Sequence, residues 1–274
     1  MLTRREDKTR CTAAWRHLHQ EYGLGRLIDN KNLHWSRDDL KQWRDLVNAD
    51  RPAHEAAQAG ADRTTISRYT ANEKLAKASV QDQRLFCHAI NAPLYLTSGE
   101  QPVHPDIEYR VHHQSIEINH YAACLIIENL ESYVYCQRFN WPGLPPTLVL
   151  YRGHDKSVQA LRTLLYRRKE SMDVYIFPDT DPAGMSIAIS TTEATHIIAP
   201  EVRSLDPKGL LRERFAVQLQ RLPNLQSQVC GFSESFQSLV SDILQTGTAV
   251  SQEWLCAHEV PLKLIPMADT HHRA

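Results

Sequence analysis

The sequence lacks any long hydrophobic run and any excess of charge of one sign. No stretch approaches the roughly 18 consecutive apolar residues that a membrane-spanning helix needs, so we expect no membrane span. The start, MLTRREDKTR, is charged and no apolar stretch follows it, which predicts the absence of a secretory signal. With 31 basic and 32 acidic side chains, net charge gives no argument for a nucleic-acid partner. We expect a cytoplasmic protein.

Cysteine patterns that indicate a disulfide framework or a zinc cluster are also missing. The six cysteines are scattered and form no CxxC pair, which favours reduced, mostly buried thiols. Fourteen histidines are present, but no HExxH motif or Cys/His spacing accompanies them. The hydrophobic fraction of 42% and the charged fraction of 23% are ordinary for a folded chain. A length of 274 residues allows one large domain or two modest ones.

The first hundred residues are predicted to form a mostly helical arm. Apolar residues recur at helical spacing in three segments, 10–22, 37–48 and 81–90. Residues 60–78 resemble the recognition half of a helix-turn-helix, which makes Arg68 a candidate for DNA contact, although an ordinary surface helix explains the same pattern. The arm is open between a winged helix and a plain helical bundle. Residues 101–121 are rich in turn formers and are predicted to form a linker or a small β-element.

From residue 122 the chain changes to short apolar runs separated by polar or amphipathic stretches. The runs are Cys124–Ile127, Thr147–Tyr151, Asp173–Phe177 and His196–Ala199, and the stretches between them are 130–138, 155–169 and 182–190. Short apolar strands that alternate with helices are typical of βαβ units around a parallel sheet. We therefore predict an α/β fold over about residues 122–200. A mostly helical extension completes the domain 122–274, with helices at Leu210–Gln220, Ser233–Leu244 and Ser251–His258.

Three carboxylates follow the predicted strands. Glu128 ends the first strand in LIIENLE, and Asp179 and Asp181 follow the third strand in YIFPDTDPAG. Because functional groups gather beyond the carboxyl ends of parallel strands, we expect these acids to face one crevice. They would repel one another unless a hard divalent cation neutralised them, and oxygen ligands suit Mg²⁺. A lone acid after a strand is usually a helix cap or a solvated turn, but the order strand–Glu, strand–Gly, strand–DxDxxG favours a catalytic metal site.

The three motifs LIIENLE, LYRGHD and FPDTDPAGM together resemble the Toprim domain of topoisomerases, bacterial primases and several nucleases. Glu128, Gly153, Asp179 and Asp181 fall on the positions of the Toprim pattern. The motifs ENLE and DxDPAG are most similar to those of the nuclease subunits of Wadjet-type and MksBEFG-type SMC defence systems (the JetD or MksG class). These subunits are relatives of the topoisomerase VI A subunit. Asn129 stands where many Toprim domains have glycine, which fits this subgroup better than the primases. The motifs cover about residues 122–200.

The resemblance implies a Rossmann-like Toprim fold and a metal-dependent DNA endonuclease. It implies Mg²⁺ or Mn²⁺ as cofactor, with Asp179 and Asp181 as ligands and Glu128 as a further ligand or as general base. The family's late Gln-Glu pair matches Gln252 and Glu253 in SQEWL, which would make Glu253 an auxiliary metal ligand. The implied partners are double-stranded DNA, a second copy of the chain, and the SMC ATPase and kleisin-type subunits of a system that acts against plasmid or foreign DNA.

Further residues near the motifs are candidates for the site. Four basic residues are candidates for phosphate contacts, although a solvated helix face explains them nearly as well: Lys156, Arg162, Arg167 and Arg168. His154, beside Gly153, is a candidate site residue or makes a structural hydrogen bond. Gly184, in the DxDPAG turn, also belongs to the candidate site.

Three other functions compete with hydrolysis. A topoisomerase-like strand transferase needs a tyrosine nucleophile, for which Tyr22 and Tyr69 are available outside any recognisable motif. A primase-like enzyme would be expected to carry a zinc-binding module, and the sequence has none. A Toprim fold could also serve as a non-catalytic DNA-binding adaptor, although such a role gives no reason for the three acids to stay together.

Overall fold

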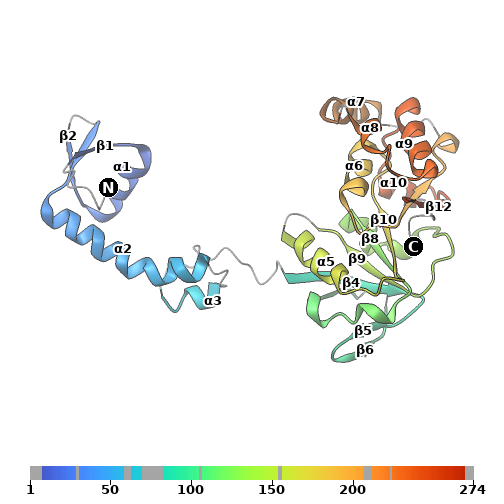
Figure 1. Ribbon diagram of the computed structural model, residues 1–274, viewed down its shortest axis with the longest axis horizontal. Helices are drawn as coiled ribbons and strands as arrows, with labels where there is room; N and C mark the ends of the chain where they lie inside the picture. Colours follow the sequence, from blue (N-terminus) through green and yellow to red (C-terminus); the bar gives the residue numbers. More distant parts are fainter. Residues whose placement is uncertain are drawn as a thin grey trace. The chain divides into compact units, whose positions relative to one another are not determined.

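The computed structural model describes residues 8–28, 31–58, 63–69, 83–104, 107–153, 156–206, 211–222 and 224–268. The chain divides into two compact units, residues 1–80 and 81–274 (Figure 1). We expected an arm over residues 1–100 and a linker over 101–121. The division lies earlier because residues 84–112 add strands to the sheet of the second unit.

The first unit combines three short strands with helices. Its elements are β1 (Lys8–Arg10), α1 (Ala13–Tyr22), β2 (Arg26–Ile28), β3 (Asn32–His34), α2 (Arg37–Gln58) and α3 (Arg63–Ile66). The strands form an antiparallel sheet in the order β1-β3-β2. Leu33 and Trp35 are fully buried, and the rings of Trp15 and Trp43 meet Trp35 edge to face, with centroids 5.4 and 5.9 Å away. Aromatic burial therefore supplies the core of this small unit.

The helices predicted within 10–22 and 37–48 are confirmed as α1 and α2. The three strands were not predicted, because a run of three residues is too short to display an alternating pattern. Of the segment 60–78, only residues 63–69 are described, and they contain the single turn α3. The rest of the proposed helix-turn-helix lies outside the described residues.

The second unit is built on a mixed sheet of seven strands in the order β12-β11-β10-β8-β9-β4-β7. The strands are β4 (Arg84–Ile90), β7 (Tyr109–His112), β8 (Ala123–Ile127), β9 (Thr147–Tyr151), β10 (Asp173–Phe177), β11 (His196–Pro200) and β12 (Leu262–Pro266). The central strands β9, β8, β10 and β11 run parallel, as predicted from their apolar runs. The outer strands β4, β7 and β12 pair antiparallel. A separate hairpin joins β5 (Leu94–Leu96) and β6 (Gly99–Gln101).

The prediction of a helix over residues 81–90 is wrong, since β4 occupies most of this segment. Leu85, Cys87 and Ala89 alternate along β4 and are all buried. The strand pairs with β7 on one side and β9 on the other. Pairing with two distant strands thus determines the conformation of a segment whose apolar residues also fit a helix.

Helices cover both faces of the sheet. Cys124 and Ile126 of β8 pack in one core with α5 (Lys156–Tyr166), α6 (Pro182–Ser190) and α9 (Glu234–Thr246). The alternate residues Leu125 and Ile127 pack in a second core with α4 (Leu130–Val134) and α10 (Gln252–Ala257). Parallel strands require this arrangement, because they are buried on both faces. The remaining elements are α7 (Arg212–Arg221), α8 (Leu225–Gln228), η3 (His113–Ser115), η4 (Ile118–His120), η5 (Cys136–Arg138) and η6 (Val202–Ser204).

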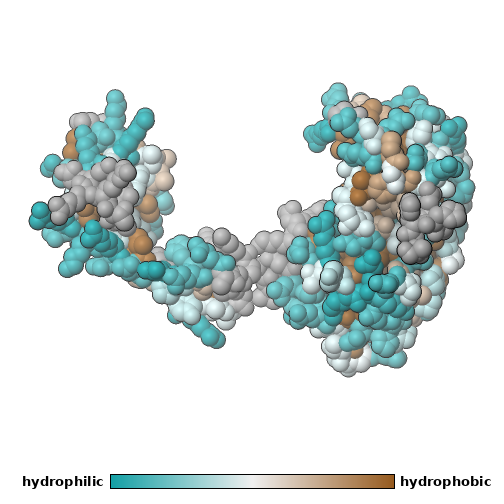
Figure 2. Space-filling model, viewed as in Figure 1, coloured by the Kyte–Doolittle hydropathy of each residue, from teal (hydrophilic) through white to brown (hydrophobic). Residues whose placement is uncertain are grey.

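The visible surface is mostly hydrophilic (Figure 2), and none of the cysteines forms a disulfide. The visible face of each unit is mostly hydrophilic, with smaller hydrophobic areas (Figure 2). Of the helices in the described ranges, none combines the length and the apolar character that crossing a bilayer requires. All six cysteines are free, and Cys87, Cys124 and Cys136 are buried.

Replacing Leu125 in the middle of β8 by alanine tests the placement of the second core. Leu125 is fully buried, so Leu125→Ala is expected to lower the free energy of unfolding by roughly 2–5 kcal/mol. Urea denaturation followed by far-UV circular dichroism measures the change. Leu130→Ala, at the exposed start of α4, is the matched control and should cost less than about 1 kcal/mol. Equal losses in the two variants would contradict this placement.

Candidate functional site

Glu128, Asp179 and Asp181 lie at the adjoining carboxyl ends of β8 and β10. Glu128 directly follows β8, and its backbone N–H donates to the carbonyl of Phe177 at the end of β10, 3.2 Å away. The Oε2 atom of Glu128 accepts a hydrogen bond of 3.1 Å from the backbone N–H of Asp179. Because β8 and β10 are parallel neighbours, two acids that are 51 residues apart in the chain come into contact.

The turn between β10 and α6 directs both aspartates to one side. Thr180 exchanges two backbone hydrogen bonds with Val250, of 2.9 and 3.1 Å, so the turn is extended and fixed to a distant segment. Successive side chains of an extended chain point to opposite sides, which leaves Asp179 and Asp181 on the same side. Asp181 also caps α6, since its Oδ1 atom accepts a hydrogen bond of 2.7 Å from the N–H of Gly184.

Gly184 lets the start of α6 approach the backbone of Asp179. A Cβ atom at this position would run into the carbonyl oxygen of Asp179, which belongs to the rigid main chain. Gly153, in the turn after β9, has a φ of +69°, and a Cβ there would collide with the side chain of Ser157. Both glycines named from the sequence therefore have a steric role in the structure.

Two side chains of α7 cover the aspartates. One guanidinium nitrogen of Arg214, Nη2, lies 2.6 Å from Oδ2 of Asp179 and 2.7 Å from Oδ2 of Asp181. One helical turn further on, the amide of Gln218 donates to the same Oδ2 atom of Asp181 over 2.9 Å. Asp181 is fully buried, so a charge without a partner here would be costly. The sequence did not identify Arg214 and Gln218 as site residues. Their i, i+4 spacing, which places them on one face of a helix, was the only available signal.

Gln252 holds the ends of the two strands together from α10. Its backbone N–H donates to Oδ1 of Asp179 over 2.9 Å, and its side-chain amide donates to the carbonyl of Phe177. Its Oε1 atom accepts from the backbone N–H of Asn129 at 3.4 Å. Gln252 is fully buried. The Gln-Glu pair singled out from the sequence thus reaches the site through its glutamine.

Glu253, predicted as an auxiliary metal ligand, lines a hollow on the protein surface to which none of the three acids contributes in the structure. It lines a space of about 270 Å³ between α4, η5 and α10, together with Glu131 and Arg138. Because the side chain of Gln252 points to Phe177 and Asn129 at the strand ends and Glu253 is the next residue on the helix, the two side chains leave the helix in different directions.

The environment of the acids shifts their proton affinities. Burial and the carboxylate of Asp179 raise the pKa of Glu128 to about 7, while the N–H of Asp179 and the charge of Arg152 oppose this shift. Burial also raises the pKa of Asp179, against the opposing effects of the Gln252 N–H and Arg214. A carboxyl group with a pKa near neutrality can exchange a proton under physiological conditions, as a general base must.

The chemistry of these side chains fits a hard divalent cation, since all three supply carboxylate oxygens. Both Oδ2 atoms of the aspartates converge on one point, and that point carries positive charge from Arg214. In the described parts of the chain, however, no three His, Cys, Asp or Glu side chains are grouped so that they could hold a metal ion. The type of ligand suits Mg²⁺, but in this arrangement the two aspartates are neutralised by Arg214.

The structure separates the predicted phosphate-binding arginines from the acids. α5 runs back along the sheet, so its last turn lies near the amino ends of the strands, where the Lys169 N–H donates to Asn119, just before β8. Arg167 there donates to the carbonyl of His113 at 2.7 Å, and Arg168 to that of Leu165 at 3.0 Å. Arg162 reaches the carbonyl of Ser190 at the end of α6.

The other residues predicted to contact DNA or to belong to the site lie in both units. Lys156 is the first residue of α5, after the glycine turn that follows β9. Arg68 is exposed and belongs to the first unit. His154 lies outside the described residues.

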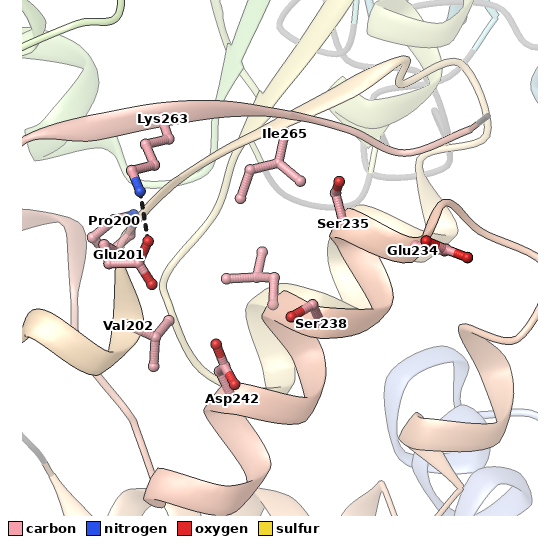
Figure 3. Close-up of a pocket in the computed structure, with 10 residues that line it drawn as sticks. Pro200, Glu201, Val202, Glu234, Ser235, Ser238, Asp242, Lys263 and Ile265 are labelled. Atoms are coloured by element: carbon pink, nitrogen blue, oxygen red, sulfur yellow. Dashed lines mark hydrogen bonds and ion pairs between the residues drawn. The ribbon is translucent and has the colours of Figure 1, made fainter. Parts of the chain in front are cut away.

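A larger hollow, of about 450 Å³, lies beside β12 between η6 and α9 (Figure 3). Lys263 of β12 forms an ion pair with Glu201 across its rim, and Asp242 of α9 lines it and pairs with Arg203. Glu128, Asp179 and Asp181 together are called the acid cluster. Among the described residues that line this hollow, none belongs to the acid cluster. Hollow and acid cluster are therefore separate features of the second unit.

Fold and site together define a mixed α/β protein with an acid cluster at the carboxyl ends of parallel strands. Residues 82–264 match the family described as Domain of unknown function (DUF7281). The match spans more than half of the chain, so the chain belongs to this family. It includes the acid cluster, Arg214 and Gln252. No curated protein matches the chain.

Gly184→Ala tests the close approach of α6 to Asp179. The added methyl group has to push the α6 start away from a main-chain carbonyl, which is expected to cost about 1–3 kcal/mol of unfolding free energy. Chemical denaturation measures it. Gly231→Ala is the matched control, because no atom lies within 4 Å of the added Cβ, and its effect should stay within about 0.5 kcal/mol. A Gly184→Ala variant as stable as the control would contradict the packing described.

The raised pKa of Glu128 predicts a specific pH dependence of stability. The folded carboxyl keeps its proton up to about pH 7, whereas the unfolded one loses it near its ordinary pKa of 4.5. The folded state therefore binds more protons in this window, and the free energy of unfolding falls as the pH rises from 4.5 to 7. The fall should be greater in the wild type than in Glu128→Gln, by on the order of 2 kcal/mol.

Urea titrations across this pH range in the presence of a metal chelator make the comparison. Glu131→Gln, which changes an exposed glutamate nearby, should follow the wild type. If the curves of the wild type and Glu128→Gln run parallel, Glu128 does not titrate in this window.

Proposed function

We propose that the second unit is a Toprim-type, metal-dependent DNA endonuclease. The observation that carries the proposal is the meeting of Glu128, Asp179 and Asp181 at the carboxyl ends of the neighbouring parallel strands β8 and β10. Ligands and catalytic groups in open parallel sheets gather at this edge. The order of the three motifs, with a glycine turn after β9, agrees with the Toprim resemblance.

Each acid has a role in hydrolysis of a phosphodiester. Asp179 and Asp181 would hold Mg²⁺ or Mn²⁺, which supplies stabilisation of the charge that develops on the phosphate and on the leaving 3′ oxygen. Glu128, with a pKa of about 7, takes the proton of the water whose oxygen attacks the phosphorus. Gln252 keeps Asp179 aimed at the cluster, and the cap on α6 does the same for Asp181.

The proposed enzyme acts on double-stranded DNA in the cytoplasm as a homodimer, together with an SMC ATPase and kleisin-type subunits, against plasmid or foreign DNA. This assignment follows the resemblance to the nuclease subunits of SMC defence systems. We extend the proposal to the first unit as a domain that binds DNA or a partner, and its three-stranded antiparallel sheet is unlike a plain helical bundle.

A second candidate function is a non-catalytic DNA-binding adaptor. The observation in its favour is that Arg214 already neutralises Asp179 and Asp181, so the cluster is electrostatically satisfied without a metal. Such a protein would keep the acids as a structural ion-pair network.

Plasmid nicking and linearisation with Mg²⁺ or Mn²⁺ separates the two functions. Asp179→Asn keeps the shape of the side chain but removes the charge, and it should reduce metal-dependent cleavage by roughly 100-fold or more. Glu170→Gln, an exposed acid on the connection that precedes β10, should leave cleavage unchanged. If purified wild type does not cut, the assay is repeated with the SMC complex. Absence of cutting there too, or equal cutting by Asp179→Asn, would favour the adaptor.

A further inference from the structure

A single nitrogen atom marks the point on which the two aspartates converge. Nη2 of Arg214 is within 2.7 Å of Oδ2 of both Asp179 and Asp181, so both oxygens lie within contact distance of one position. An ion shared by both oxygens would lie about 2.0–2.1 Å from each of them and would need space that Nη2 now occupies. Guanidinium and metal ion therefore exclude each other there.

Arg214 cannot give up this position by losing its charge. An arginine stays protonated at any physiological pH, and although burial lowers the pKa of Arg214, the carboxylates around it raise this pKa above its ordinary value. The guanidinium leaves only if the side chain swings away or if α7 moves.

α7 is fastened to the acid cluster mainly by polar contacts. None of its ten residues is buried. Phe215 is half-buried against the first core, whereas Leu211 and Val217 are about half exposed. Gln218 adds hydrogen bonds to Asp181 and to the N–H of Ala183. A helix with so little buried apolar surface belongs to the part of a fold that opens at low free-energy cost.

We propose that Arg214 is an internal competitor of the divalent cation, so that the metal binds Asp179 and Asp181 only when the guanidinium withdraws from them. The inference rests on the proposed nuclease function and adds a control to the same site. In the resting chain the aspartates are neutralised and inactive. A partner or a DNA substrate that draws Arg214 away would open the cluster to the metal, and the freed guanidinium could then pair with a phosphate.

Direct measurement of Mn²⁺ binding tests the competition without an activity assay. Binding of Mn²⁺ to the full chain is measured by the loss of the free-ion signal in electron paramagnetic resonance. Arg214→Gln should bind Mn²⁺ about tenfold more tightly than the wild type, because the competing ion pairs are gone. Arg212→Gln, an exposed arginine of the same helix, should match the wild type. Adding Asp179→Asn to Arg214→Gln should abolish the gain.

Thermal unfolding gives a second readout that remains informative if Arg214→Gln is destabilised. Without metal, this variant should melt lower than the wild type, and Mn²⁺ should raise its melting temperature more than that of the wild type. Gln218→Ala, which loosens α7 but keeps Arg214, should show a smaller gain in Mn²⁺ affinity.

The outcomes distinguish the two proposals. Equal or weaker Mn²⁺ binding by Arg214→Gln, with clear binding by the wild type, would overturn the competition but leave the nuclease proposal intact. No Mn²⁺ binding by either protein, although both are folded, would overturn the metal site itself and with it both proposals.

Discussion

Mutual repulsion of carboxylates at the ends of β8 and β10 is the constraint around which the second unit is arranged. Asp181 is completely buried and Asp179 nearly so, and buried charges persist only when they are paired or hydrogen-bonded. Segments from three places in the chain supply these partners, and one of them also fixes the turn that carries the acids. The start of α6 supplies an N–H, α7 a guanidinium and an amide, α10 a second N–H, and the segment at Val250 fixes the turn that carries both acids.

The central strands and the position of the acids follow from local sequence. Each of β8 to β11 is a short apolar run, and a strand buried on both faces needs little else to be identified. Once β8 and β10 are parallel neighbours, the contact between Glu128 and Asp179 follows from geometry alone. β4 was misjudged because Leu85, Cys87 and Ala89 become a buried strand face only through pairing with β9, whose residues lie about 60 positions further on.

The partners of the acids could not be predicted in the same way. Arg214 lies 35 residues beyond Asp179, on a helix whose sequence RERFAVQLQR contains four charged residues and gives no sign which of them turns inward. Gln252 lies 73 residues beyond Asp179, and its contribution is made partly by its backbone N–H, which no side-chain motif encodes. Contacts of this kind depend on how helices pack on the finished sheet.

Gln252 and Arg214 hold Asp179 by bonds of different physical character, and this difference has a consequence for ionic conditions. Gln252 is neutral and fully buried, so its hydrogen bonds to the strand ends are insensitive to dissolved salt. Arg214 is partly exposed to solvent and holds the aspartates by charge, an attraction that mobile ions weaken. Rising ionic strength therefore acts on the arginine side of the acids and leaves the Gln252 side unchanged, and its effect is smaller than for a fully exposed ion pair because Asp181 is buried.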